Sequence, residues 1–80
     1  MKTREAVAQR IYELCEERGI TTNALARLSG VSPSTVKSII YGASSNPGIV
    51  TIKMLCDGLD ITLGDFFSTE VFNSLEQEIE

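Results

Sequence analysis

The stretch LARLSGVSPSTVKSIIYG, residues 25–42, contains the signals for two short helices joined by a tight turn. Gly30 follows an apolar-periodic run, and its access to the left-handed conformation allows a helix to end there. Ser32 offers a hydroxyl to the free backbone N–H groups of a new helix. Pro33 takes the first helical position, where its missing N–H costs nothing. The stretch therefore predicts a helix-turn-helix.

A helix-start signal recurs four times in the chain: an apolar residue precedes a Ser or Thr, and a second apolar residue follows four positions later. The hydroxyl caps the helix, and the apolar pair closes over it as a hydrophobic staple. The four matches are Ile20-Thr21 with Leu25, Val31-Ser32 with Val36, Val50-Thr51 with Leu55, and Ile61-Thr62 with Phe66. Together with the glycine stop signals they predict helices over about residues 3–18, 22–29, 33–41 and 52–59 and from residue 63, with a loop over 42–50.

No window alternates apolar and polar residues for long enough to predict a strand, so the expected fold class is all-α, with five short helices around one core. The end of the chain allows two interpretations: the SLEQEIE segment either continues the fifth helix or forms a sixth helix after a break near Ser68. We therefore expect one domain over residues 1–67 and a helical C-terminal extension over residues 68–80.

The composition indicates a single globular domain, because 80 residues with 42% hydrophobic and 22% charged residues can bury one small core. No segment reaches the roughly 18 consecutive apolar residues of a membrane span, and the N-terminus lacks the apolar core of a secretory signal. We expect a cytoplasmic protein in which the isolated Cys15 and Cys56 are buried and reduced.

Histidine is absent from the chain, which removes the usual general base and the usual neutral metal ligand. No carboxylates cluster in a recognisable catalytic or metal-binding pattern. The sequence therefore predicts a protein that is not an enzyme, with no catalytic residues, no cofactor and no metal site.

Charge is unevenly distributed along the chain, whose net charge is -4. Residues 18–53 contain four basic residues and no acidic one, whereas residues 57–80 contain seven acidic residues and no basic one. Because the second and third predicted helices both lie in the acid-free part, their basic residues can share a face. This pattern predicts a surface that faces an anionic partner.

The residues of the predicted helix-turn-helix and the two following helices resemble the Cro/CI-type (XRE) family of prokaryotic and phage transcriptional regulators. The resemblance spans about residues 5–67 and rests on Leu25-Ala26, Gly30-Val31-Ser32, Val36, Ile39, Gly42, Asn46-Pro47, Thr51-Ile52, Leu55, Leu59 and the segment 63–67. It implies a lambda-repressor-like fold and a sequence-specific, nucleoid-associated regulator of transcription, in particular a repressor. One departure is Asp60, which stands where family members commonly place Gly, although Asp also tolerates the left-handed conformation.

The resemblance also implies which side chains face DNA, since the outward residues early in the second helix of the motif meet base edges in the major groove. By position the base readers are Ser34, Thr35, Lys37 and Ser38. The expected phosphate contacts are Thr22, Asn23, Arg27, Ser32, Tyr41, Ser44, Ser45 and Asn46, of which Ser32 acts chiefly as the helix cap. Ser and Thr can pair with several bases, so we expect a tolerant operator.

With few basic residues, one copy neutralises only a handful of phosphates, and we expect a homodimer on an inverted-repeat operator of double-stranded DNA. The expected dimer contacts are Val71, Phe72, Leu75 and Ile79, whose spacing is helical; alternatively this stretch folds back over the first helix. A second function remains open, in which the chain is an antitoxin-like or anti-repressor-like module. Its acidic C-terminal helix would then dock on a protein partner, with DNA binding secondary.

Overall fold

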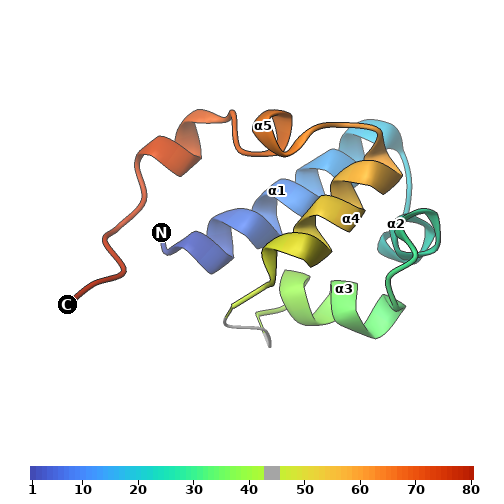
Figure 1. Cartoon of the computed structure of the whole chain (residues 1–80), viewed down its shortest axis with the longest axis horizontal. Coiled ribbons are helices and arrows are strands. Elements are labelled where there is room, and N and C mark those ends of the chain that lie inside the picture. The colour runs from blue at the N-terminus through green and yellow to red at the C-terminus, as the bar shows by residue number, and fades with distance from the viewer. Residues whose placement is uncertain (43–45) are drawn as a thin grey trace.

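The computed structural model describes residues 1–42 and 46–80, and the elements found there are all helical, which confirms the predicted fold class (Figure 1). In chain order they are α1 (Thr3–Arg18), α2 (Thr22–Ser29), α3 (Pro33–Ile40), α4 (Ile49–Leu59), α5 (Leu63–Phe66) and a 3-10 turn, η1 (Glu70–Asn73). The predicted boundaries of α1 and α2 are those observed, and α3 ends one residue earlier than predicted.

Three of the four predicted helix starts are confirmed by hydroxyl caps. The side chain of Thr21 accepts a hydrogen bond from Ala24 N at 3.0 Å. In the same way Ser32 accepts from Thr35 N at 3.3 Å, and Thr62 accepts from Asp65 N at 3.0 Å. Each cap satisfies a backbone donor that the first helical turn leaves unpaired.

The fourth predicted start is wrong. The helix α4 begins at Ile49 with Gly48 as its N-cap, so Thr51 lies inside the helix and the preceding loop ends two residues earlier than expected. The first turn is already closed by a hydrogen bond from Ile52 N to Gly48 O at 3.1 Å. Glycine is an acceptable N-cap because it adopts the required extended conformation at little cost.

The core lies where α1 packs on α3 and α2 packs on α4, with α5 closing one end. Its buried side chains include Ile11, Leu25, Val36, Leu55, Leu59 and Phe66, each with an exposed fraction of 1% or less. The two cysteines are free and buried, as predicted, and burial raises the pKa of both thiols. They therefore act as small apolar core residues.

A close approach between α2 and α4 fixes the helix-turn-helix on the rest of the domain. Gly58 of α4 lies against Ser29, and a Cβ added at Gly58 would be 3.1 Å from the Ser29 Cα. Beyond Gly58, α4 ends at Asp60 in the left-handed conformation, with a φ of 56°. The expected tolerance of Asp at this position is thereby confirmed.

The predicted C-terminal helix is wrong. After α5 the chain forms only η1 and then continues without helical structure from Ser74. Within this segment Phe72 packs on Phe67 with ring centroids 5.0 Å apart, so that part of the extension does fold back on the core. From Ser74 the chain runs past the start of α1, where Glu76 N donates a hydrogen bond to Met1 O at 3.2 Å. The backbone groups Glu76 N and Gln77 O, which a helix would pair internally, are instead hydrogen-bonded to Met1 O and Lys2 Nζ, just before α1.

Candidate nucleic-acid interface

The helix α3 has a buried side and an exposed side. Val36 and Ile39 face the core and are 0% and 3% exposed. On the opposite side Ser34, Thr35 and Lys37 are exposed, as predicted for base-reading positions. Three of the four expected base readers are thus accessible on α3.

The hydroxyl groups at the start of α3 are linked to one another. The Ser32 Oγ lies 2.8 Å from the Thr35 Oγ1 and 3.2 Å from the Ser34 Oγ. Because one of these oxygens must donate in each pair, the hydroxyl protons of the cluster are partly committed within the protein. Lys37 takes no part in the cluster and Ser34 makes the longer of its two contacts, so these two side chains have the greatest freedom in this group to meet a ligand.

Ser38, the fourth expected base reader, is less accessible than the other three. It is half-buried and lines a hollow of about 150 Å³ between α3 and the start of α4, together with Thr35, Pro47 and Thr51. A group that contacts Ser38 must enter this hollow. Ser38 can therefore contact a base edge or a thymine methyl only where the DNA reaches past Thr35 into the hollow.

Apart from Ser32 and Tyr41, the expected phosphate-contact residues belong to α2 and to the segment 44–46. Asn23 and Arg27 are exposed on α2, and Thr22 at its start is half-buried. Asn46 is exposed in the loop before α4. The expected contacts Ser44 and Ser45 lie outside the described residues.

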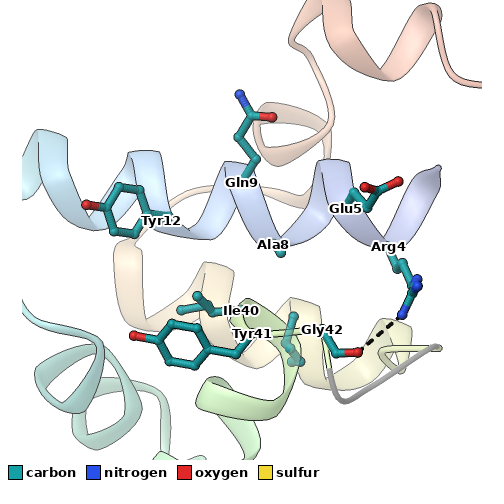
Figure 2. Close-up of a pocket in the computed structure, with 9 residues that line it drawn as sticks. Arg4, Glu5, Ala8, Gln9, Tyr12, Ile40, Tyr41 and Gly42 are labelled. Atoms are coloured by element: carbon teal, nitrogen blue, oxygen red, sulfur yellow. Dashed lines mark hydrogen bonds between the residues drawn. The ribbon is translucent and has the colours of Figure 1, made fainter. Parts of the chain in front are cut away.

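Tyr41, at the C-terminal end of α3, is 76% exposed and lies apart from the hydroxyl cluster. Figure 2 shows Tyr41 and Tyr12 of α1 beside each other in a hollow of about 630 Å³. The neighbouring Glu16 carboxylate raises the pKa of Tyr12, so this phenol remains protonated at neutral pH. The structure therefore places Tyr41 at the edge between α3 and α1, away from the serines at the start of α3.

Arg4 was missed by the sequence reasoning. Its Nη1 donates a hydrogen bond to Gly42 O at 3.2 Å, which fixes the start of α1 beside the loop that follows α3 (Figure 2). The two residues are 38 positions apart in the chain. Only the fold brings this cation next to the acid-free segment.

In the structure the acid-free segment supplies α2, the turn and α3, and these two helices pack against each other. The described residues of α2, the turn and α3 contain the cations Arg27 and Lys37 and no acidic residue. The other two cations of residues 18–53 are engaged: Lys53 on α4 is paired with Asp57, and Arg18 donates a hydrogen bond to Leu59 O. Exposed cations without nearby acids favour an anionic ligand through long-range attraction.

Residues 10–71 match the sequence profile of the Cro/C1-type HTH DNA-binding domain. This match covers most of the chain, and the chain belongs to that family. The protein is thus a DNA-binding transcriptional regulator of the helix-turn-helix class.

Solved structures of similar proteins agree with this assignment. Prophage Lp1 protein 11 is 38% identical with a TM-score of 0.80, and the match covers 91% of this chain and 97% of that one. An HTH_3 family transcriptional regulator from Vibrio cholerae is 32% identical with a TM-score of 0.74; the match covers 81% of this chain but only 36% of the longer Vibrio protein. The restriction-modification controller protein C.Esp1396I is 21% identical with a TM-score of 0.79 over 94% of this chain and 95% of that one, a likeness that shows the fold alone. No curated protein sequence matches the chain.

Among the described residues, 1–42 and 46–80, no helix has the length and apolar character needed to cross a membrane. In the same residues no three His, Cys, Asp or Glu side chains are grouped so that they could hold a metal ion.

Proposed function

We propose that the protein is a sequence-specific transcriptional repressor that binds an inverted-repeat operator as a homodimer, with α3 in the major groove. The observation that carries the proposal is the exposed side of α3, where Ser34 and Lys37 project from a helix whose opposite side is buried in the core. The hydroxyl side chains on this side are short and let the helix approach the bases closely, while the longer Lys37 can reach a base or a phosphate.

The exposed groups at the start of α3 suggest a division of roles. Ser34 and Lys37 read bases directly, while Thr35 and Ser38 contribute where the duplex approaches the hollow beside α4. The main role of Ser32 is to cap the start of α3, and a contact with phosphate is its lesser role. Because hydroxyl groups discriminate weakly between bases, the operator tolerates substitutions at several positions and relies partly on DNA shape.

Phosphate binding in this proposal comes from both sides of α3. On one side, Thr22, Asn23 and Arg27 meet the backbone at α2, whose N-terminus attracts anions. On the other side, Asn46, together with Ser44 and Ser45 of the same loop, follows the backbone beyond the groove. Tyr41 adds its hydroxyl at the edge of the surface, where it is 76% exposed.

The second copy is proposed to dock on the C-terminal extension through Val71, Phe72, Leu75 and Ile79. Ile79 supports this role because it is 81% exposed, the largest exposed fraction among the apolar residues of the described chain. Phe72 contributes chiefly by holding η1 on the core, since its ring packs on Phe67. Two copies double the number of phosphate contacts and give the operator its two-fold symmetry.

A selection of bound sites from a random duplex library tests this function. We expect the selected sites to share an inverted repeat whose half-sites are about one helical turn apart. Ser34→Ala should then relax the preference at one position of each half-site, because it removes a hydroxyl from the reading surface. Ser74→Ala is the matched control: it removes a hydroxyl outside the motif and should leave the selected sequence unchanged.

Selected sites that lack two-fold symmetry would contradict the dimer, and an unchanged preference in Ser34→Ala would contradict readout by this residue. The alternative of a protein-interaction module depended on an acidic C-terminal helix. Residues 74–80 are not helical in this structure, so no observation favours that function and we do not propose it.

A further inference from the structure

The end of the chain is attached to the start of α1 by several hydrogen bonds. The Glu78 carboxylate accepts hydrogen bonds from Thr3 N at 3.1 Å and from the Thr3 hydroxyl at 2.9 Å. In addition Lys2 Nζ donates to Gln77 O at 2.7 Å. We call residues 74–80 the acidic tail, because three of its seven residues are glutamates. These hydrogen bonds therefore hold the acidic tail at a defined position beside the start of α1.

The acidic tail lies on the same surface as the loop that precedes α4. One hollow of about 850 Å³ is lined by Glu78 and Glu80 of the tail, by Lys2 and Arg4, and by Asn46 of the loop. Arg4 also donates a hydrogen bond to Gly42 O at the beginning of that loop. We call Lys2 and Arg4, with Asn46 beside them, the cationic edge.

The Glu78 carboxylate of the hollow is suited to compete with another anion. The hydrogen bond from Thr3 N, followed by that from the Thr3 hydroxyl and by the positive charges of Lys2 and Arg4, holds the pKa of Glu78 below its usual value. The side chain is therefore ionised at neutral pH. It is also exposed, and exposed charge-assisted contacts such as its hydrogen bonds from Thr3 are weak enough to exchange for those of another anion.

We propose that the two carboxylates of the acidic tail that line this hollow, Glu78 and Glu80, compete with DNA within the molecule: they occupy the cationic edge in the free protein and are displaced from it by duplex phosphates. The inference rests on the proposed function, in which the loop at Asn46 runs along the DNA backbone, and the displacement of these side chains leaves the proposed dimer contacts Leu75 and Ile79 in place. With the tail in place, Glu78 and Glu80 lie beside the loop and repel an approaching phosphate. Once the two carboxylates leave the hollow, Lys2 and Arg4 add two cations to a surface that otherwise depends on Arg27 and Lys37.

This arrangement reconciles an acidic chain with an anionic ligand. A DNA phosphate that replaces a tail carboxylate contacts the same cation of the protein. This new contact offsets the free-energy cost of releasing the carboxylate. The tail also weakens binding to non-specific DNA, where fewer contacts are available to displace it. Its effect must fall as salt rises, because both the repulsion and the exchanged contacts are exposed to solvent.

Two double variants with the same change of net charge separate a local effect from a general one. Glu78→Gln with Glu80→Gln neutralises the tail at the cationic edge. Glu13→Gln with Glu17→Gln neutralises two exposed glutamates of α1 and is the matched control. Fluorescence anisotropy with a labelled random-sequence duplex measures the affinity of each variant at low and at moderate salt.

We expect the tail variant to bind about three- to tenfold more tightly than the wild type at low salt, the size expected from one or two exposed ion pairs. The control should bind less than about twofold more tightly, since its charges lie outside the hollow. At the same time the tail variant should melt at a slightly lower temperature, because Glu78 no longer accepts its charge-assisted bonds from Thr3. If the tail served only to stabilise the fold, its neutralisation would lower the melting temperature without raising the affinity for DNA.

Equal tightening in both double variants would overturn the inference and assign the effect to net charge. The inference would also be overturned if sedimentation showed that the tail variant binds more tightly only because it dimerises more strongly. If neither the wild type nor the variants show saturable binding to any duplex, the proposed function itself fails. Saturable binding that is identical in wild type and tail variant would leave the proposed function standing and reject the tail as a competitor.

Discussion

The helix-turn-helix over residues 22–40 and the C-terminal extension over residues 68–80 both carry apolar residues at helical spacing, yet they fold differently. In the first region each helix begins at a hydroxyl cap, and α2 ends at a left-handed glycine, Gly30. In the extension, the Thr69 side chain makes no cap hydrogen bond and only one 3-10 turn forms. In these two regions, apolar residues at helical spacing thus form a helix only where the ends of the helix are capped and one of its sides is buried.

The difference also separates two kinds of surface. The helix-turn-helix exposes short polar groups from a rigid, buried scaffold, whereas the acidic tail is joined to α1 by exposed hydrogen bonds. Exposed bonds open at a small free-energy cost, while core contacts open only with the whole domain. Changes in the first region should therefore alter the stability of the fold, and changes in the tail should alter mainly what the surface binds.

The largest expected effect comes from truncating a core residue of α2. Leu25→Ala should lower the free energy of unfolding by about 2–5 kcal/mol, because Leu25 is 0% exposed and its removal leaves a cavity. Ile79→Ala in the tail should change it by no more than about 0.5 kcal/mol, since Ile79 is largely exposed. Urea denaturation at low protein concentration measures both. A tail variant as destabilised as the core variant would remove the distinction between the two regions.

A smaller effect is expected at the contact between α2 and α4. Gly58→Ala should be destabilising, because the added methyl overlaps the Ser29 Oγ and lies 3.1 Å from the Ser29 Cα. Overpacking of this kind costs about 1–3 kcal/mol, against a gain in helix propensity of about 1 kcal/mol. Ser29→Ala should be neutral or stabilising by up to about 1 kcal/mol, because its buried hydroxyl has no hydrogen-bond partner among the described residues. Thermal melts of the single and double variants measure both changes. A marked loss of stability in Ser29→Ala would show that its hydroxyl is satisfied.

The weakest expected effect on stability is the acid titration of the tail. Because the pKa of Glu78 is lowered by its hydrogen bonds to Thr3, this carboxylate stabilises the folded protein above its ordinary pKa of 4.5, and the contribution is lost as the pH falls through the lower folded value. Residues 18–53 contain no acid that could titrate there. Melting temperature against pH should therefore fall less steeply below about pH 5 in Glu78→Gln than in the wild type. Parallel curves would show that the Glu78 contact contributes nothing to stability.

The sequence predicted the parts of the molecule that local signals determine. Thr21, Ser32 and Thr62 marked helix starts because a hydroxyl cap acts within four residues, and Asp60 served as a left-handed cap. The start of α4 was missed because its cap, Gly48, has no side chain to reveal it.

Local sequence signals also predicted part of the candidate site, and its long-range contacts could not be predicted. The exposed and buried sides of α3 follow from the helical period, so Ser34, Thr35 and Lys37 could be assigned to the surface from the sequence. The link from Arg4 to Gly42 and the attachment of the acidic tail to α1 are long-range contacts, which no local pattern encodes. The half-buried position of Ser38 likewise depends on how the start of α4 packs beside α3.

The most direct test of the central claim, that the exposed side of α3 binds DNA, is the salt dependence of duplex binding in Lys37→Ala and in Lys53→Ala. Both variants lose one positive charge, but Lys37 is exposed on α3 and Lys53 is paired with Asp57 on α4. We predict that the slope of log affinity against log salt falls by about one in Lys37→Ala and is nearly unchanged in Lys53→Ala. Equal slopes in the wild type and both variants, or stronger dependence on Lys53 than on Lys37, would contradict the claim.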